Sequence, residues 1–204
     1  MKAINLFNKW VELKKDDGME LNHTPSVDFM LNLIPKDILK KKFRFLDLGC
    51  GNGWVVRKMS QYQNCVHAVG VDGAEKMIEK AKSKDSQSRY CHLDLNDIQE
   101  FNEKSDIIFS MEVIYYLEKP ELVFHHIFNN LLNPGGVLLL GLDHYSENTP
   151  SLSWPSDLAV SMSTYSMLKW KTMLQKHDFS NINMYQFGEK RNWSGTLVFC
   201  AQKQ

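Results

Sequence analysis

The chain has 204 residues, enough for one domain with a full hydrophobic core. Lysine plus arginine equals aspartate plus glutamate at 24 each, so no charge excess indicates a nucleic acid or an anionic membrane as partner. The four cysteines form no Cys-x-x-Cys pair, and no apolar run is long enough to span a bilayer or resembles a secretory signal. We therefore expect a single domain over residues 1–204, cytoplasmic, with free thiols.

Two helices are expected before the first strand. Apolar residues recur at helical spacing near the start of the chain, until the Asp-Asp-Gly sequence at 16–18 breaks the helix. Thr24 is a typical N-cap because proline follows it, and Pro35 would end this second helix. We expect residues 1–40 to form a helical cap and residues 43–203 a catalytic core.

From residue 43 onward, strand-like and helix-like segments alternate. Strands are expected at residues 43–48, 66–71, 90–93, 106–111, 137–142, 181–187 and 195–200. Helices are expected at residues 54–61, 74–82, 120–132 and 164–176. Such alternation predicts an α/β fold with a mostly parallel sheet and helices on both faces. The short connection between the last two strands instead predicts an antiparallel pair at the edge of the sheet.

A glycine-rich turn follows the first expected strand. Asp47, Gly49, Gly51 and Gly53 form a D-x-G-x-G-x-G pattern just before a helix. Glycine lets the backbone turn sharply and approach a ligand closely, and the start of the helix offers free N–H groups. The pattern therefore predicts a binding site for an adenosine-type cofactor.

Two residues of this turn distinguish between candidate cofactors. The dinucleotide fingerprint G-x-G-x-x-G has a third glycine for close packing, and Trp54 stands at that position. A carboxylate at Asp47 would repel a pyrophosphate. S-adenosylmethionine suits the turn better than a dinucleotide, because it carries a cationic amino group and no phosphate.

The residues that follow the second and third strands are further candidates, since ligands of open α/β sheets bind beyond the carboxyl ends of the strands. Asp72 is placed to accept hydrogen bonds from both ribose hydroxyls, and a helix N-cap is its structural alternative. Asp94 and the backbone N–H of Leu95 are placed to bind adenine. Asp94 is otherwise a cap or turn residue, and Asp97 would replace it if the register differs.

The loops after the fourth and fifth strands are expected to face the ligand site. Backbone carbonyls near Met111 could bind a cationic amino group, and Tyr115 and Tyr116 could wall a small pocket, although each could equally be a core residue. The expected substrate contacts are Trp54, Tyr115, Tyr116, His144 and Tyr145. His23 and His144 are the candidate bases or orienting donors, with a structural role as the alternative for each.

The chain resembles the class I S-adenosylmethionine-dependent methyltransferases from about Phe43 to Lys203. The glycine-rich turn, Asp72, the Asp94 region, Ser-Asp-Ile-Ile-Phe-Ser at 105–110 and Asn-Pro-Gly-Gly at 133–136 occur in the order of that family. The resemblance implies a three-layer, Rossmann-like methyltransferase sandwich of the small-molecule type. Its seven-stranded sheet would have the order 3-2-1-4-5-7-6. S-adenosylmethionine would be the cofactor and S-adenosylhomocysteine the product.

The resemblance also implies roles for individual residues. Gly49 and Gly51 would lie against the methionine part of the cofactor, and Met111 would hold its amino-acid end through the backbone. Asp72 would bind the ribose, and Asp94 and Leu95 the adenine. Gly73 departs from the family, because many members have an aliphatic residue there that packs on adenine. That contact would come from Ala74, Met77 or elsewhere.

The methyl acceptor is not specified by any motif. The fourth strand is not followed by Asn-Pro-Pro-Tyr, Asp-Pro-Pro-Tyr or Pro-Cys, which argues against the usual nucleic-acid methyltransferases, as does the zero net charge. We expect a small polar metabolite with an N, O or S acceptor, no metal, no nucleic-acid partner and no membrane partner. The alternative is a cofactor-binding subunit without turnover that serves a partner protein. The sequence does not indicate an oligomeric state.

Overall fold

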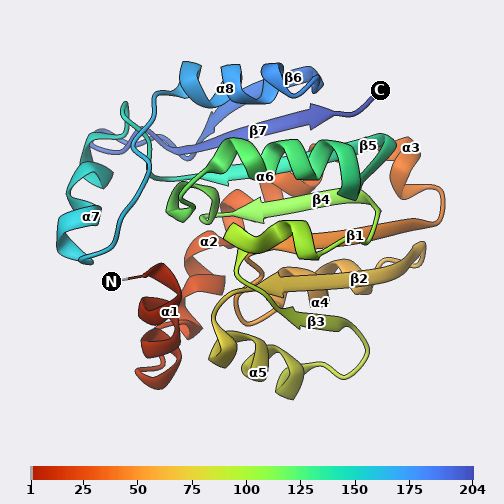
Figure 1. Ribbon diagram of the computed structural model, residues 1–204, viewed down its shortest axis with the longest axis horizontal. Helices are drawn as coiled ribbons and strands as arrows, with labels where there is room; N and C mark the ends of the chain where they lie inside the picture. Colours follow the sequence, from red (N-terminus) through yellow and green to blue (C-terminus); the bar gives the residue numbers. More distant parts are fainter. Residues whose placement is uncertain (1) are drawn as a thin grey trace.

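A seven-stranded sheet in the order β3-β2-β1-β4-β5-β7-β6 runs through the centre of the computed structural model, which describes residues 2–204 (Figure 1). Its strands are β1 (Phe43–Leu48), β2 (Cys65–Asp72), β3 (Arg89–His92), β4 (Ser105–Met111), β5 (Leu132–Leu142), β6 (Ser180–Phe187) and β7 (Thr196–Gln202). Neighbours from β3 to β5 are parallel, and β7 is antiparallel to both β5 and β6. The predicted fold class and strand order are confirmed. The antiparallel strand lies one position inside the edge, which β6 forms.

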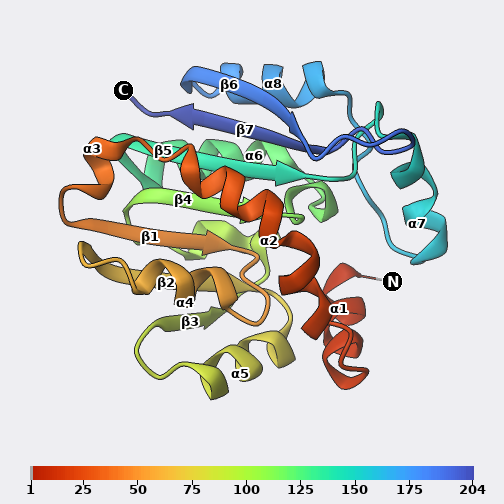
Figure 2. The same ribbon diagram turned by 180° about the vertical axis from the view of Figure 1, so that it is seen from behind.

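Helices cover both faces of this sheet (Figures 1 and 2). They are α1 (Ala3–Glu12), α2 (Asp17–Asn32), α3 (Lys36–Leu39), α4 (Trp54–Ser60), α5 (Glu75–Lys84), α6 (Pro120–His126), α7 (Trp154–Asp157) and α8 (Met167–Lys176). Apolar residues of α2, α4 and α5 pack on one face, and those of α6 and α8 on the other. The side chains of β1 point to both faces: Phe43 and Phe45 pack with α2, α4 and α5, and Leu46 and Leu48 belong to the core under α6 and α8. The strands are buried on both sides, which is typical of a parallel sheet.

Several helix boundaries differ from those expected. The second helix begins at Asp17, not at Thr24, and contains Pro25 in its interior. Thr24 does not cap a helix: its hydroxyl donates to the carbonyl of Glu20 within the same helix, at 2.6 Å. Contacts to distant residues determine the earlier start, because Asp16 is fully buried against Asn52 and Lys80.

The later elements also shift by a few residues. Ser166 accepts from the backbone N–H of Lys169 at 3.2 Å and starts α8 at Met167. The helix from Pro120 is α-helical only to His126 and continues as one π-helical turn, Ile127–Leu131. β5 includes the expected turn at 133–136, because Gly135 N donates to the carbonyl of Lys203 at 2.7 Å.

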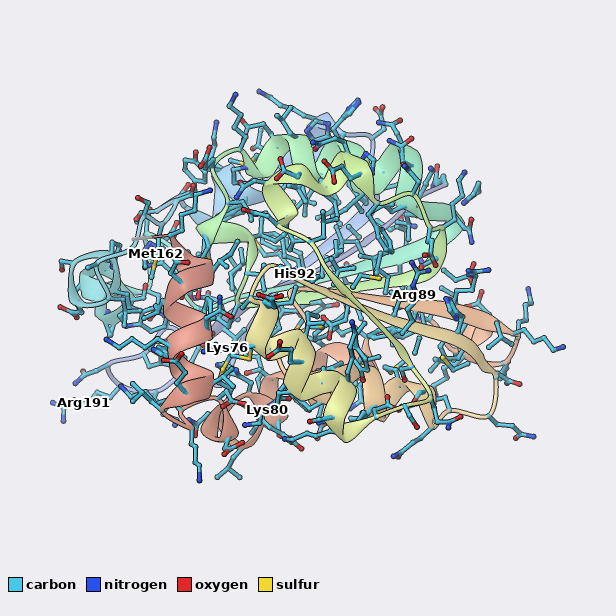
Figure 3. The ribbon with its side chains drawn as sticks, turned by 60° about the horizontal axis from the view of Figure 1, so that its bottom comes forward. Lys76, Lys80, Arg89, His92, Met162 and Arg191 are labelled. Carbon is cyan, nitrogen blue, oxygen red and sulfur yellow. The ribbon has the colours of Figure 1, made fainter. Side chains whose placement is uncertain are left out.

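Helix α1 and the start of α2 lie beyond the carboxyl ends of the central strands, and the rest of α2 packs on one face of the sheet (Figures 1 and 2). Asp16 attaches them to the core: its carboxylate pairs with Lys80 of α5 at 2.7 Å and accepts from the Asn52 side chain at 3.2 Å. Lys76 of α5 adds a contact to Glu12, and its backbone N–H donates to Asn8 at 2.9 Å. Figure 3 shows Lys76 and Lys80 side by side on α5 next to this cap.

Two general expectations about the chain can be compared with the structure. All four cysteines are free thiols, as predicted. Among residues 2–204, no helix is both long and apolar enough to cross a membrane.

Replacing Lys80 by methionine should destabilise the cap, because the fully buried Asp16 carboxylate loses its cationic partner. We expect the free energy of unfolding to fall by about 2–3 kcal/mol, as measured by urea denaturation. Lys76→Met is the matched control: it removes an ion pair whose side chains are both about half exposed, so stability should change little. Equal losses in the two variants would contradict the anchoring role of Asp16.

Candidate functional site

A cavity of about 1000 Å³ opens at the carboxyl ends of the parallel strands, under the cap helices. Its wall is formed by the loops after β1, β2, β3 and β4, by α1 and by residues of α2 and α7. This is the place where open α/β sheets bind their ligands. Of the predicted site residues, it brings together Asp47, Gly49, Gly51, Trp54, Asp72, Asp94, Leu95, Met111, Tyr115, Tyr116 and His23.

The glycine-rich turn has the conformation that glycine favours. Gly49, Gly51 and Gly53 have φ angles of +81°, +52° and +78°. A side chain at Gly49 would collide with Val113, and one at Gly53 would meet the Tyr90 ring at 2.5 Å. Gly53 lies at the N-cap of α4, behind the part of the turn that lines the cavity. These positions therefore require glycine both for the backbone angle and for close packing.

Asp72 holds this turn in place. One carboxylate oxygen accepts from Gly51 N at 2.8 Å, and the other accepts from Ala74 N at 2.7 Å. The N-cap alternative is thus present, together with a second bond that ties the end of β2 to the turn after β1. Burial raises the pKa of Asp72, and the two backbone hydrogen bonds oppose that shift. Each oxygen retains a second lone pair with which it can accept a hydrogen bond from a ribose hydroxyl.

The Asp47 carboxylate lies at the floor of the cavity and is only 3% exposed. Burial and the nearby charge of Asp72 both raise its pKa well above the usual range. A bound ammonium group would reverse this effect, because an adjacent opposite charge favours the ionised carboxylate. The position is therefore suited to the amino group of the cofactor.

Asp94 caps a helix and also lines the cavity. Its carboxylate accepts from Asn96 N at 3.0 Å and starts a 3-10 helix, Leu95–Glu100. Leu95 is buried beside it and lines the cavity. Asp97, the substitute considered from sequence, is not among the lining residues. The adenine contact of Asp94 and Leu95 stays a prediction.

Ile4 explains the unusual glycine at position 73. A Cβ atom added to Gly73 would be 2.7 Å from Ile4 Cδ1, so Ile4 of α1 occupies the space in which a side chain at 73 would lie. Ile4 and Gly73 both line the cavity. An aliphatic surface is therefore supplied from the cap helix and not from the strand end. Nothing in the local sequence around Gly73 signals this substitution.

Aromatic side chains form a large share of the cavity wall. Tyr115 and Tyr116 lie with ring centroids 4.5 Å apart, and Phe7 of α1 packs edge-on against Tyr116 at 5.4 Å. Trp54, Trp10 and Trp154 also line the cavity. This part of the wall is apolar and ring-rich, which suits a compact organic acceptor.

The structure corrects the expected placement of His144 and Tyr145, neither of which lines the cavity. His144 is fully buried, with its ring nitrogens 3.0 Å from the Ser151 carbonyl and 2.8 Å from the Thr164 hydroxyl. The Tyr145 hydroxyl donates to the Gly195 carbonyl at 2.9 Å. Both residues hold the segment after β5 against the body of the protein. Their partners come from distant loops, so the sequence around them did not indicate this role.

His23 instead lies in the cavity wall, as does Glu112, and both are close to the carboxylate of Asp143. Glu112 follows β4 directly and has φ +62°, which is uncommon for a residue other than glycine. The Tyr115 hydroxyl donates to its Oε2 at 2.7 Å, and Asp143 N donates to its Oε1. Their position in the sequence could have indicated a role in the site, because Glu112 and Asp143 are each the first residue after a central strand.

Burial shifts the pKa values of all three side chains toward their neutral forms. Burial, followed by the nearby Asp143, raises the pKa of Glu112 well above its usual range. Burial also raises the pKa of Asp143 to about 6, and it lowers the pKa of His23. His23 is therefore neutral near pH 7, with a ring nitrogen available as acceptor or ligand.

Comparison with known proteins identifies the family of this chain. Residues 21–183 match a family model described as methyltransferase domain. Malonyl-(acyl-carrier protein) O-methyltransferase of Bacillus anthracis is 32% identical over 99 residues, which are 47% of this chain and 36% of that protein. Ubiquinone biosynthesis O-methyltransferase of Dinoroseobacter shibae is 31% identical over 103 residues, 48% of this chain and 40% of that protein. The matches thus span less than half of these curated relatives.

Solved structures are similar in fold over most of the chain. One is from the complex of the Trm112 methyltransferase activator of Haloferax volcanii with a methyltransferase: its TM-score is 0.83 at 21% identity, with 96% of each chain covered. An S-adenosylmethionine-dependent methyltransferase of Mesorhizobium loti has a TM-score of 0.71 at 18% identity, with 89% of this chain and 97% of that chain covered.

Cofactor affinity should rise with pH, because Asp47 must release a proton before it can pair with the amino group of S-adenosylmethionine. Its pKa is raised in the free protein and falls when the ammonium binds, so affinity should weaken as pH drops through the raised value. Asp47→Asn should bind about 10–100-fold more weakly and lose this pH dependence, measured by calorimetry. An unchanged pH profile in that variant would assign the titration to another group.

Ile4 and Gly73 should be coupled in cofactor binding. Gly73→Leu displaces Ile4, and Ile4→Ala removes apolar contact area, so each alone should weaken S-adenosylmethionine binding about tenfold. The double variant should recover most of this loss, since the new leucine takes the place of the isoleucine. Additive losses in a double-mutant cycle would show that the two residues do not share a site.

Proposed function

Because this chain belongs to the methyltransferase domain family and is an S-adenosylmethionine-dependent methyltransferase, we propose that it methylates a small polar acceptor in the cavity beside Glu112. The observation that carries this proposal is that one cavity is lined by two kinds of residue: the glycine turn with Asp47, Asp72 and Asp94, and a set of aromatic rings with Glu112 and His23. The first set fits the cofactor, and the second is left to contact the acceptor.

The dimensions and cover of the cavity favour a small acceptor. Its volume of about 1000 Å³ is at the upper end of ligand pockets, so cofactor and acceptor can be bound together. The cap helices α1 and α2 contribute to its wall, so they would cover one side of a small acceptor. Zero net charge also argues against a nucleic-acid acceptor.

The chemistry depends mainly on alignment. S-adenosylmethionine supplies an activated methyl group on its sulfonium. In our proposal Asp47, Asp72 and the glycine turn orient the donor, and Tyr115 and Tyr116 exclude water beside the acceptor. Fixing the acceptor atom in line with the methyl group converts a bimolecular displacement into a unimolecular one, and this positioning can account for much of the rate enhancement.

Oxygen is the acceptor atom that the sequence relatives favour. Two curated relatives are named as O-methyltransferases, one for a malonyl thioester and one in ubiquinone biosynthesis. The ring-lined part of the cavity fits an acceptor with an apolar body and a polar end. We therefore propose a hydroxyl or carboxyl acceptor on a small, partly apolar molecule.

A second candidate function is a cofactor-binding subunit that acts with a partner protein. It is favoured by the similarity in fold to a chain from the complex between a Trm112 methyltransferase activator and a methyltransferase. The two hypotheses differ in whether the isolated chain turns over. Both hypotheses predict that the chain binds the cofactor, because it has a complete set of candidate cofactor residues.

Thermal shift with S-adenosylmethionine, S-adenosylhomocysteine and NAD should show stabilisation by the first two, because nothing in the turn suits a pyrophosphate. Asp72→Ala should lose cofactor affinity, since Gly51 N and Ala74 N lose their common acceptor as well as the ribose contact. Stabilisation by NAD alone would contradict the cofactor assignment. Unchanged binding in Asp72→Ala would contradict the role given to Asp72.

Transfer of labelled methyl groups to a panel of hydroxyl, carboxyl, amine and thiol metabolites should identify an acceptor for the isolated chain. We expect the label on oxygen. Cofactor binding without transfer to any metabolite would favour the subunit hypothesis, and transfer only after addition of a partner protein would establish it.

A further inference from the structure

Three side chains with metal-binding groups meet at the acceptor end of the cavity: His23 from α2, Glu112 after β4 and Asp143 after β5. One ligand atom of each lies within 4.8 Å of the other two. Two atoms bound to the same divalent cation are separated by at most about 4–5 Å. The three side chains are therefore close enough to share one ion.

Asp143 gives independent evidence that this cluster can bind a ligand. The residue is only 8% exposed, and its Oδ1 atom has no hydrogen-bond partner among residues 2–204. The Thr196 side chain hydrogen-bonds to the carboxylate, so one oxygen is held while the other is left without a partner. An unpaired buried oxygen is costly in free energy and calls for an explanation.

The charges of the cluster favour a cation. Glu112, which is partly buried, and Asp143, which is buried, are neighbouring carboxylates, and among residues 2–204 no ion pair includes either of them. Two like charges at this separation destabilise each other unless a proton or a cation lies nearby. The neutral nitrogen of His23 adds a donor atom that binds metal ions and does not attract an organic ammonium by charge.

We propose that His23, Glu112 and Asp143 bind one divalent transition-metal ion. One imidazole nitrogen with two carboxylate oxygens suits Zn²⁺ or Mn²⁺ better than Mg²⁺ or Ca²⁺, which prefer oxygen ligands alone. Glu112 is already oriented for this role by the Tyr115 hydroxyl, at 2.7 Å, and by the backbone N–H of Asp143. Such supporting hydrogen bonds commonly fix the ligands of metal sites.

The ion would border the space assigned to the acceptor, because His23 and Glu112 line the cavity. A metal ion held there would act as a Lewis acid and would lower the pKa of an acceptor hydroxyl. The hydroxyl proton passes to solvent, the oxygen forms a bond to the methyl carbon, and the bond from that carbon to the sulfonium sulfur breaks to leave a neutral thioether. This catalytic role rests on the proposed function, whereas metal binding by the three residues does not.

Calorimetric titration of the full chain with MnCl₂ and ZnCl₂ tests the site directly. We expect one ion per chain, with weaker binding of Mg²⁺ and Ca²⁺. Glu112→Gln, Asp143→Asn and His23→Gln should each weaken Mn²⁺ binding at least about tenfold, and Tyr115→Phe should weaken it by about the same factor. Asp157→Asn is the matched control, because Asp157 lines the same cavity outside the cluster.

Two further measurements make the result decisive. S-adenosylmethionine binding and circular dichroism should be retained in the three ligand variants, which separates metal loss from unfolding or cofactor loss. The electron paramagnetic resonance signal of bound Mn²⁺ should disappear in the same variants. Absence of binding at millimolar metal, or equal binding in the variants and the parent chain, would overturn the site and leave the methyl-transfer proposal standing.

Discussion

The cofactor site depends on the carboxylate of Asp72, which joins the ends of two neighbouring strands. It accepts from Gly51 N at 2.8 Å and from Ala74 N at 2.7 Å. The carbonyl of Val71 reinforces the same junction by accepting from Gly49 N at 2.7 Å. With the turn after β1 held in this way, the three glycines have left-handed backbone angles and α4 starts directly behind them. An acidic residue here thus has a structural duty whether or not a ribose is bound.

The cap helices complete the cavity that this junction begins. The fully buried Asp16 connects the start of α2 to Lys80 and Asn52, and so fixes the cap to the core. Ile4 then occupies the space that the absence of a side chain at Gly73 leaves open. We expect the contact with adenine that related proteins make from the strand end to come here from a helix about seventy positions earlier in the chain.

The surroundings of Glu112 differ from the junction at Asp72. Glu112 has φ +62° and lies beside the buried carboxylate of Asp143. Unfavourable backbone angles and uncompensated charges of this kind persist mainly where function requires them. The rest of the fold, with apolar cores on both faces of the sheet, provides the stability that permits this arrangement.

The sequence alone determined the alternation of strands and helices, the glycine turn and the cofactor class, because these depend on local chemistry: periodic apolar residues, glycine where φ is positive, and an acidic residue at a strand end. The strand order was implied by the family resemblance that these motifs carry. Only the tertiary structure decided which side chains face the cavity after β5. His144 and Tyr145 lie outside it, held by Ser151, Thr164 and Gly195. The tertiary structure also brought together Ile4 with Gly73, and His23 with Glu112 and Asp143. Such pairs are far apart along the chain, and their contact depends on how helices pack over a sheet, which no local pattern encodes.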